Sequence, residues 1–198
     1  MWWLLAFLLL VALPVVVTAR ETPQRLRDVR AGLRGVVYVP VLLVVLLVVA
    51  ALAWELARLV PLLRWGWLGA NVVVAPLAGL LPAAEGGAGG GTVGATPLLG
   101  PAVTLAVFVP FVLLAFVLFN WYEEAYYRGS LRDVAVWAAL HLVMGIPLFA
   151  VLPIFATGLV YKLIRDRRGL RTAYVAHLGT NTTLLALLVV GILLGPAV

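Results

Sequence analysis

The residues of this sequence that could carry out acid–base chemistry are few, and they lie beside or within apolar stretches. Two adjacent glutamates, Glu123 and Glu124, follow an apolar run, and the two histidines of the chain, His141 and His177, lie inside hydrophobic segments. Ionisable groups at membrane depth are costly, so they are functional candidates by default. Because carboxylates and imidazoles commonly transfer protons in enzymes, these residues predict an enzyme that works inside a membrane.

Spacing along a helix predicts a different role for each of these groups. Glu124 and Arg128 are four residues apart and can form an ion pair on one helix face. Glu123 is rotated about 140° from Arg128 at 3.6 residues per turn, so we expect its carboxylate to be unpaired and able to act as a general base for water. His177 and Asn181 are also four residues apart, and their N–H groups could stabilise a developing oxyanion.

Simpler explanations exist for each of these residues taken alone. The two glutamates with Arg128 could be a solvated helix end. Either histidine could bond a backbone carbonyl, and His177 with Asn181 could join two helices by hydrogen bonds.

The order of the apolar runs is expected to bring the ionisable groups together. The run 101–120 ends beside the glutamates, on the membrane side where the run 134–147 begins, and two crossings later the run 172–194 starts on that side again. At about 1.5 Å per residue, His141 lies about 13 Å past the helix start near Leu131, and His177 about 9 Å past Arg171. We therefore expect Glu123, His141 and His177 to share one layer just below one membrane surface.

The composition predicts the fold class. Of the 198 residues, 65% are hydrophobic and 11% charged, and the mean hydropathy is +1.14, whereas soluble domains carry about 25% charged residues. We predict an all-α polytopic transmembrane helical bundle of about seven helices, at residues 2–19, 36–56, 67–84, 101–120, 134–147, 148–163 and 172–194. The first run is expected to be a retained helix, because no basic residue precedes it as in a signal peptide.

The chain is expected to divide into two parts. Residues 1–100 hold N-terminal transmembrane helices, an amphipathic interfacial link at 20–34 and a glycine-rich extramembrane loop at 84–100. Residues 101–198 form the catalytic helical core. Within the core, Ser130 and Asp133 predict a capping box at a helix start, and Gly169 fits a helix C-terminus. Aromatic residues at the span ends, Tyr161 among them, are interpreted as an interfacial belt.

The residue types present in the chain exclude several other catalytic mechanisms. Cysteine is absent, so there are no disulfides or thiolate nucleophiles. Ser130 is the only serine and lies in a predicted turn, and the three aspartates lie in links, which excludes a Ser–His peptidase and a buried aspartyl dyad. The net charge of +6 comes from arginines in the links, a pattern of membrane loops rather than of nucleic-acid binding. Glu123, His141 and His177 also form a His₂Glu set, so a zinc-dependent membrane peptidase remains an alternative.

Three short motifs carry a resemblance to a known family. Glu123-Glu124-Ala-Tyr-Tyr-Arg128 is followed by Trp137-Ala-Ala-Leu-His141 and then by His177-Leu-Gly-Thr-Asn181. This order resembles the CPBP intramembrane glutamic endopeptidases, the CAAX protease and bacteriocin-processing (Abi) family, whose signature reads EExxxR, FxxxH and HxxxN. Trp137 stands where that signature has phenylalanine. The resemblance covers residues 101–194.

The resemblance implies a metal-independent glutamic peptidase that needs no cofactor. Glu123 assisted by His141 would activate water, His177 and Asn181 would stabilise the oxyanion, and Glu124 with Arg128 would hold the motif in place. The implied partners are the lipid bilayer and a membrane-associated peptide or protein substrate, with or without a lipid group. No nucleic-acid partner is implied, and no oligomeric state is predicted. A non-catalytic immunity or regulatory membrane protein of the same fold is the alternative.

The distribution of basic residues predicts the orientation in the cell membrane. The links 128–133 and 162–171 must share one side, and with seven helices Arg58 and Arg64 lie there too. This side holds nine of the fourteen Lys and Arg residues, against five at 20–34. The positive-inside rule then places the catalytic layer at the cytoplasmic face of a multi-pass membrane protein.

Overall fold

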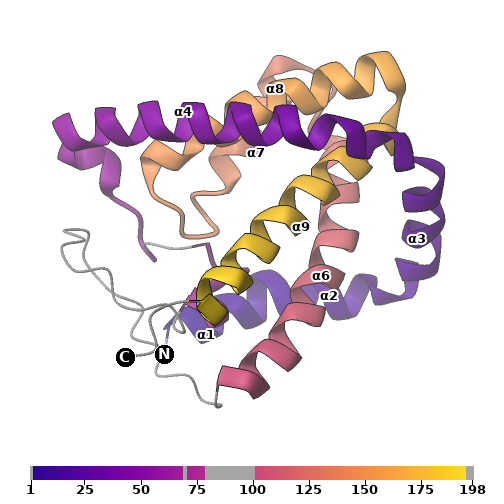
Figure 1. The fold of residues 1–198 in the computed structure, drawn as a ribbon, viewed down its shortest axis with the longest axis horizontal. Helices are drawn as coiled ribbons and strands as arrows, with labels where there is room; N and C mark the ends of the chain where they lie inside the picture. Colours follow the sequence, from indigo (N-terminus) through magenta and orange to yellow (C-terminus); the bar gives the residue numbers. More distant parts are fainter. Residues whose placement is uncertain (1, 69–70, 79–100, 195–198) are drawn as a thin grey trace.

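A computed structural model describes residues 2–68, 71–78 and 101–194, and within these ranges every regular element is a helix. Five helical stretches are long and apolar enough to cross a membrane: Leu4–Ala31, Leu33–Leu59, Pro101–Tyr126, Leu148–Arg168 and Leu170–Leu194. The all-helical prediction is therefore confirmed, and these helices are those of an integral membrane protein. Their arrangement is shown in Figure 1.

The predicted count of about seven spans is not confirmed. The expected span 67–84 lies partly outside the described residues, and its described part holds a turn and the four-residue α5 (Ala75–Ala78). The expected span 134–147 is only half helical, because α7 (Leu131–Leu140) gives way to turns in which Gly145 has a φ of 92° and Pro147 follows. Ten residues rise about 15 Å, too little to cross a bilayer. The glycine-rich segment 84–100 lies outside the described residues.

The N-terminal span is one continuous helical stretch with a local irregularity. It runs through α1 (Trp2–Phe7), the π-helical η1 (Leu8–Ala12), α2 (Leu13–Thr18), η2 (Ala19–Glu21) and α3 (Thr22–Ala31). The wider π turn lies just before Pro14, whose ring would clash with a carbonyl of the preceding turn in a regular helix. The direction of the chain changes at η2, so that α3 lies across the end of the bundle (Figure 1).

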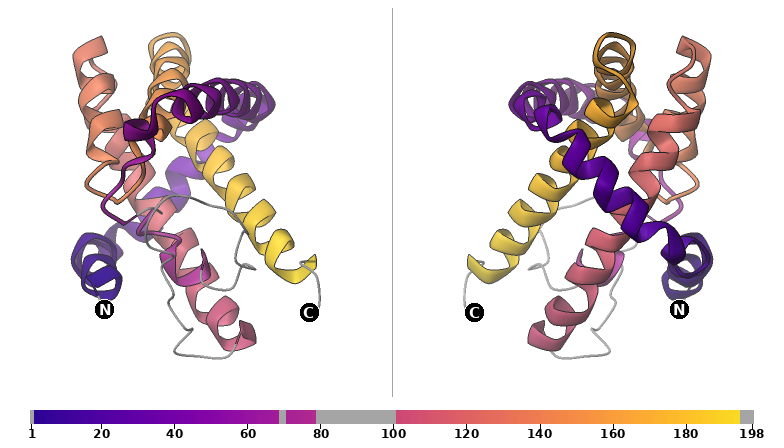
Figure 2. Two further views of the ribbon diagram at one scale, coloured as in Figure 1. Left: turned by 90° about the vertical axis from the view of Figure 1, so that its left-hand side faces the viewer. Right: turned by 90° about the vertical axis from the view of Figure 1, so that its right-hand side faces the viewer.

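The remaining helices form crossing pairs. After η3 (Leu33–Tyr38), α4 (Val39–Leu59) runs beside α8 (Val151–Arg168) and ends at η4 (Pro61–Arg64). The helices α6 (Pro101–Tyr126) and α9 (Leu170–Leu194) pack on each other, and η5 (Leu148–Ala150) leads into α8 (Figure 2). Gly35 lets η3 cross the start of α9, because a Cβ at this position would overlap the carbonyl oxygen of Thr172.

Local signals in the sequence are found where they were predicted. The Asp133 N–H donates to Ser130 Oγ at 3.1 Å and the Ser130 N–H donates to Asp133 Oδ2 at 2.8 Å, which completes the capping box at the start of α7. Gly169 has a φ of 85° directly after α8, a conformation that favours glycine. The capping box fixes the start of α7, and Gly169 fixes the end of α8.

The segment 20–34 packs on the bundle through a few residues, while most of its side chains are exposed. Arg25 and Asp28 face the bundle, and the Arg25 guanidinium lies 3.4 Å from the centre of the Trp121 ring. Tyr122 donates a hydrogen bond of 2.5 Å to Glu21 at the end of η2, so η2 and the start of α3 are attached to the part of α6 that carries the glutamates.

Ion pairs gather most of the basic residues at one end of the bundle. Arg171 Nε lies 2.9 Å from Asp28 Oδ1, and Arg165 donates to the Ala125 carbonyl at 3.3 Å. Lys162 also donates to the Arg128 carbonyl at 3.3 Å, so the segments 20–34, 128–133 and 162–171 lie together. Arg58 lies in the last turn of α4 and Arg64 in η4, at the opposite end of α4 from η3 (Figure 1). The sequence grouped Arg58 and Arg64 with the glutamates because it counted the run 67–84 as a crossing, and the structure instead places them away from that cluster of basic residues.

Candidate active site

Glu124 and Arg128 form the ion pair that their spacing predicts. Arg128 donates from Nε to Glu124 Oε1 at 3.1 Å, and Nη2 lies 2.9 Å from the same oxygen. Both side chains have an exposed fraction of 0%. The guanidinium also lies 3.8 Å from the centre of the Trp137 ring, a cation–π contact between the end of α6 and α7. The pair joins these two helices behind the cavity.

Glu123 faces a cavity instead of a basic partner. Its side chain keeps an exposed fraction of 22%, and its Oε2 lies 3.6 Å from His177 Nε2, beyond hydrogen-bond distance. No arginine or lysine of the described residues pairs with it, as the helical spacing predicts. Its carboxylate is therefore available to a water or a substrate.

The surroundings of His177 determine which of its ring nitrogens carries hydrogen. Nδ1 lies 2.9 Å from Glu124 Oε1. Because an ionised carboxylate only accepts hydrogen bonds, Nδ1 must be the donor, which leaves Nε2 facing Glu123. The ring also stacks on Tyr161 at 4.3 Å between centroids. The Trp137 ring meets it edge-on at 5.7 Å between centroids, so His177 is held on three sides, with Nε2 facing the cavity.

His141 is held in the same manner at the C-terminal end of α7. Its Nδ1 lies 2.9 Å from the Trp137 carbonyl oxygen, which can only accept, so Nδ1 carries the hydrogen. In the neutral imidazole, Nε2 then keeps a lone pair and is an acceptor. The edge of the ring meets the Trp137 ring at 4.8 Å between centroids. Trp137 therefore positions both His141 and Arg128.

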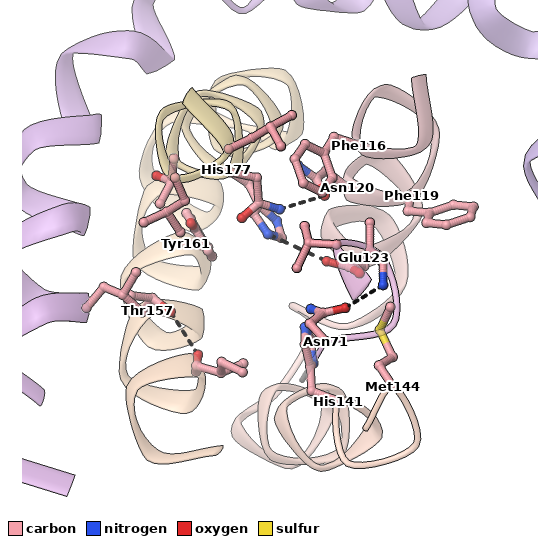
Figure 3. A pocket seen from close by; sticks show the side chains of 18 of the residues that line it. Asn71, Phe116, Phe119, Asn120, Glu123, His141, Met144, Thr157, Tyr161 and His177 are labelled. Atoms are coloured by element: carbon pink, nitrogen blue, oxygen red, sulfur yellow. Dashed lines mark hydrogen bonds and ion pairs between the residues drawn. The ribbon is translucent and has the colours of Figure 1, made fainter. Parts of the chain in front are cut away.

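Asn181 approaches from α9. Its Nδ2 donates to Asn120 Oδ1 on α6 at 3.1 Å, which uses one of its two amide hydrogens. The second hydrogen remains for a group in the cavity. Figure 3 shows Asn120 and His177 on one side of Glu123 and His141 on the other.

These residues line one cavity of about 290 Å³ between the helices. Glu123, Trp137, His141, His177 and Asn181 all belong to its wall, together with apolar residues from α6 and α9. A second cavity of about 330 Å³, between the N-terminal helix and α6–α7, also reaches Glu123 and His141. The layer expected from the sequence is present, and Glu124 with Arg128 lies behind it.

Some polar residues of the cavity were not expected from the sequence. They are Asn71, Asn120, Thr157, Tyr161 and Thr180. Tyr161 was assigned to the interfacial belt, but it is 2% exposed and packs on His177. The position of Asn120 could have indicated that it faces the cavity, because it is a polar residue one helical turn before Glu123. Asn71 gave a weaker one, as a lone amide in an apolar run.

A metal-binding set is not evident in the described residues. No group of three His, Cys, Asp or Glu side chains among them is arranged to hold a metal ion.

Comparison with known proteins yields no relative. The chain matches no family model, no curated protein and no solved structure. The motif resemblance therefore depends on the quoted residues alone, and the function is inferred from the cavity.

Proposed function

We propose that this protein is an intramembrane glutamic endopeptidase, related to the CPBP family, that hydrolyses peptide bonds without a metal. The observation that carries the proposal is the shared cavity, in which Glu123, His141, His177 and Asn181 meet from three segments of the chain. Such a convergence of ionisable groups inside a bundle of membrane-length helices is costly unless it is used.

The hydrogen-bond inventory supports water activation. Glu123 and His141 Nε2 are both acceptors at the cavity, so a water between them can donate a hydrogen to each. Glu123 then takes a proton while the water oxygen bonds to the substrate carbonyl carbon, which forms a tetrahedral intermediate. The same proton passes to the leaving amine as the C–N bond breaks, so the enzyme returns to its starting state.

The opposite side of the cavity offers groups for the oxyanion. Asn181 has one amide hydrogen left after its bond to Asn120. His177 can donate from Nε2 only as an imidazolium, because Nδ1 already holds the hydrogen directed at Glu124. Donors held in place before the reaction stabilise developing negative charge strongly in a water-poor site.

The walls of the cavity indicate the substrate class. Phe116, Leu184 and Leu188 line it beside the polar groups. An apolar side chain next to the cleaved bond would bury against these residues. Membrane-associated peptides or proteins, with or without a lipid group, therefore fit better than charged soluble peptides.

The charge distribution supports a cytoplasmic catalytic side in a cell membrane. Twelve of the fourteen Lys and Arg residues lie at the end of the bundle that carries α3, and Arg58 and Arg64 lie at the other. This asymmetry exceeds the one counted from the sequence, because the segment 20–34 now adds to the same side. The positive-inside rule places that end in the cytoplasm.

The proposal is tested by replacing Glu123 with glutamine in the purified protein. Cleavage of a library of internally quenched peptides with apolar residues at the centre should fall by about 10²–10⁴ in rate, because an amide cannot take the proton of water. Glu55→Gln, at an exposed site on α4, is the matched control and should cleave like wild type. Full activity in a folded Glu123→Gln protein would refute the mechanism. A wild-type protein that cleaves no peptide, and that leaves the termini of membrane proteins unchanged in cells, would favour a non-catalytic role.

A further inference from the structure

A non-helical segment that belongs to none of the three motifs also reaches the cavity. Residues 65–68 and 71–74 lie against the turns that follow α7: the Trp67 indole N–H donates to the Leu142 carbonyl at 2.8 Å, and the Val72 N–H donates to the Met144 carbonyl at 2.8 Å. Val72 itself is fully buried in the core. These contacts hold Asn71 at the wall of the cavity that contains Glu123 and His141.

The orientation of the Asn71 amide follows from its hydrogen bond. The Val73 backbone N–H donates to Asn71 Oδ1 at 2.9 Å. A backbone N–H can only donate, so the accepting atom must be the oxygen, and Nδ2 is directed the other way. Among the residues that the structure describes, none accepts a hydrogen bond from this Nδ2. Asn71 thus presents a donor at a wall whose neighbouring polar groups are acceptors.

A water molecule between Glu123 and His141 needs such a donor. If it gives one hydrogen to each of these acceptors, its two lone pairs remain. One lone pair attacks the substrate carbonyl carbon, and the other is free to accept a hydrogen bond. Buried waters in proteins usually make about three hydrogen bonds, which Glu123 and His141 alone do not supply.

We infer that Asn71 is a further catalytic residue, which donates from Nδ2 to the nucleophilic water and directs the attacking lone pair. In Figure 3, Asn71 and His141 lie on one side of Glu123, and His177 lies on the other. The water would therefore be held on the Asn71 side, while Asn181 and His177 face the oxyanion. This role rests on the proposed peptidase function.

Three variants at position 71 distinguish the role of the Nδ2 donor from that of the Oδ1 acceptor, which stabilises the turn. Asn71→Asp keeps an acceptor for the Val73 N–H but removes the donor. Asn71→Ser also keeps an acceptor without adding charge, and its hydroxyl hydrogen sits one atom closer to the backbone than Nδ2, too short to take the place of the amide donor. Asn71→Ala removes both. We expect Asn71→Ser and Asn71→Asp to melt like wild type and to lose about 10²-fold in kcat with KM unchanged, since a poorly oriented nucleophile costs rate rather than binding. The assay uses the quenched peptide that wild type cleaves best.

The other outcomes each decide the question. If Asn71→Ser and Asn71→Asp keep wild-type kcat and only Asn71→Ala loses activity, Asn71 merely holds the turn and the inference is overturned. If neither Ser nor Asp variant folds, its role is structural and the inference is again overturned. Glu123→Gln is measured in parallel. If the position-71 variants keep wild-type activity while Glu123→Gln is inactive, only the role of Asn71 is overturned. If Glu123→Gln is active, or if the wild type cleaves no peptide, the proposed peptidase function is overturned.

Discussion

Replacing Arg128 with methionine removes the positive charge behind the cavity while keeping most of the side-chain volume. In the native protein Glu124 accepts hydrogen bonds from Arg128 and from His177, and its side chain and that of Arg128 are 0% exposed. The variant leaves a buried carboxylate with His177 as its remaining polar partner. Breaking one side of a buried ion pair typically costs about 3–5 kcal/mol. Because methionine still packs on Trp137 and His177 still donates, we expect the lower end, about 3 kcal/mol.

The exposed pair of Glu55 and Arg58 gives a matched control in the same protein. The Glu55 and Arg58 side chains are 63% and 60% exposed and lie near the C-terminal end of α4. Such surface pairs contribute between about 0 and 1 kcal/mol, so Arg58→Met should change the free energy of unfolding by less than 1 kcal/mol. The difference in the free energy of unfolding between the two arginine variants then measures how much more a buried ion pair matters than an exposed one.

The free energy of unfolding can be measured by titrating SDS into mixed micelles and following tryptophan fluorescence. The double variant Glu124→Gln with Arg128→Met should be more stable than Arg128→Met alone, with a coupling energy of about 0.5–3 kcal/mol, because it no longer buries an unpaired charge. Equal losses from Arg128→Met and Arg58→Met, or additive effects in the double variant, would show that Glu124 and Arg128 are not a buried pair.

Three further predictions follow from other parts of the structure. A Cβ at Gly158 would lie 2.8 Å from the Trp137 ring, so Gly158→Ala should lower the free energy of unfolding by about 1–3 kcal/mol through overpacking. A Cβ at Gly191 would have nothing within 4 Å, so Gly191→Ala should leave the free energy of unfolding unchanged or raise it by about 0.5–1 kcal/mol. Equal SDS midpoints for the two variants would contradict this. Peptide cleavage should survive metal chelators, and inhibition reversed by added zinc would favour the zinc-dependent alternative. A single cysteine at Arg167 should react with an impermeant maleimide only after cells are permeabilised, and one at Arg58 in intact cells; the reverse pattern would put the catalytic side outside.

The features that sequence predicts well here depend on helical periodicity or on the order of crossings. The pairing of Glu124 with Arg128 follows from 3.6 residues per turn, and the Ser130–Asp133 capping box is a local pattern. The meeting of Glu123, His141 and His177 required only that the chain return to the side of the glutamates before α9 begins. Each of these needs no knowledge of how side chains pack.

The features that sequence predicts poorly depend on packing. An apolar run such as 67–84 has the same hydropathy whether it crosses the bilayer or turns back inside the protein, so periodicity could not separate the two. The side of Arg58 and Arg64 followed from the number of crossings and was wrong for that reason. Tyr161 lies near a span end, but only the position of His177 shows that it packs inward.

The origin of the cavity residues has a consequence for biogenesis. Asn71 comes from the first half of the chain, Glu123 and His141 from the middle of the second half, and His177 and Asn181 from the last described helix. During synthesis α9 leaves the ribosome after the other segments that line the cavity, so no nascent chain that lacks it contains a complete set of these groups. A peptidase assembled in this order would stay inactive during its own membrane insertion, when unfolded segments of the same chain lie close to it.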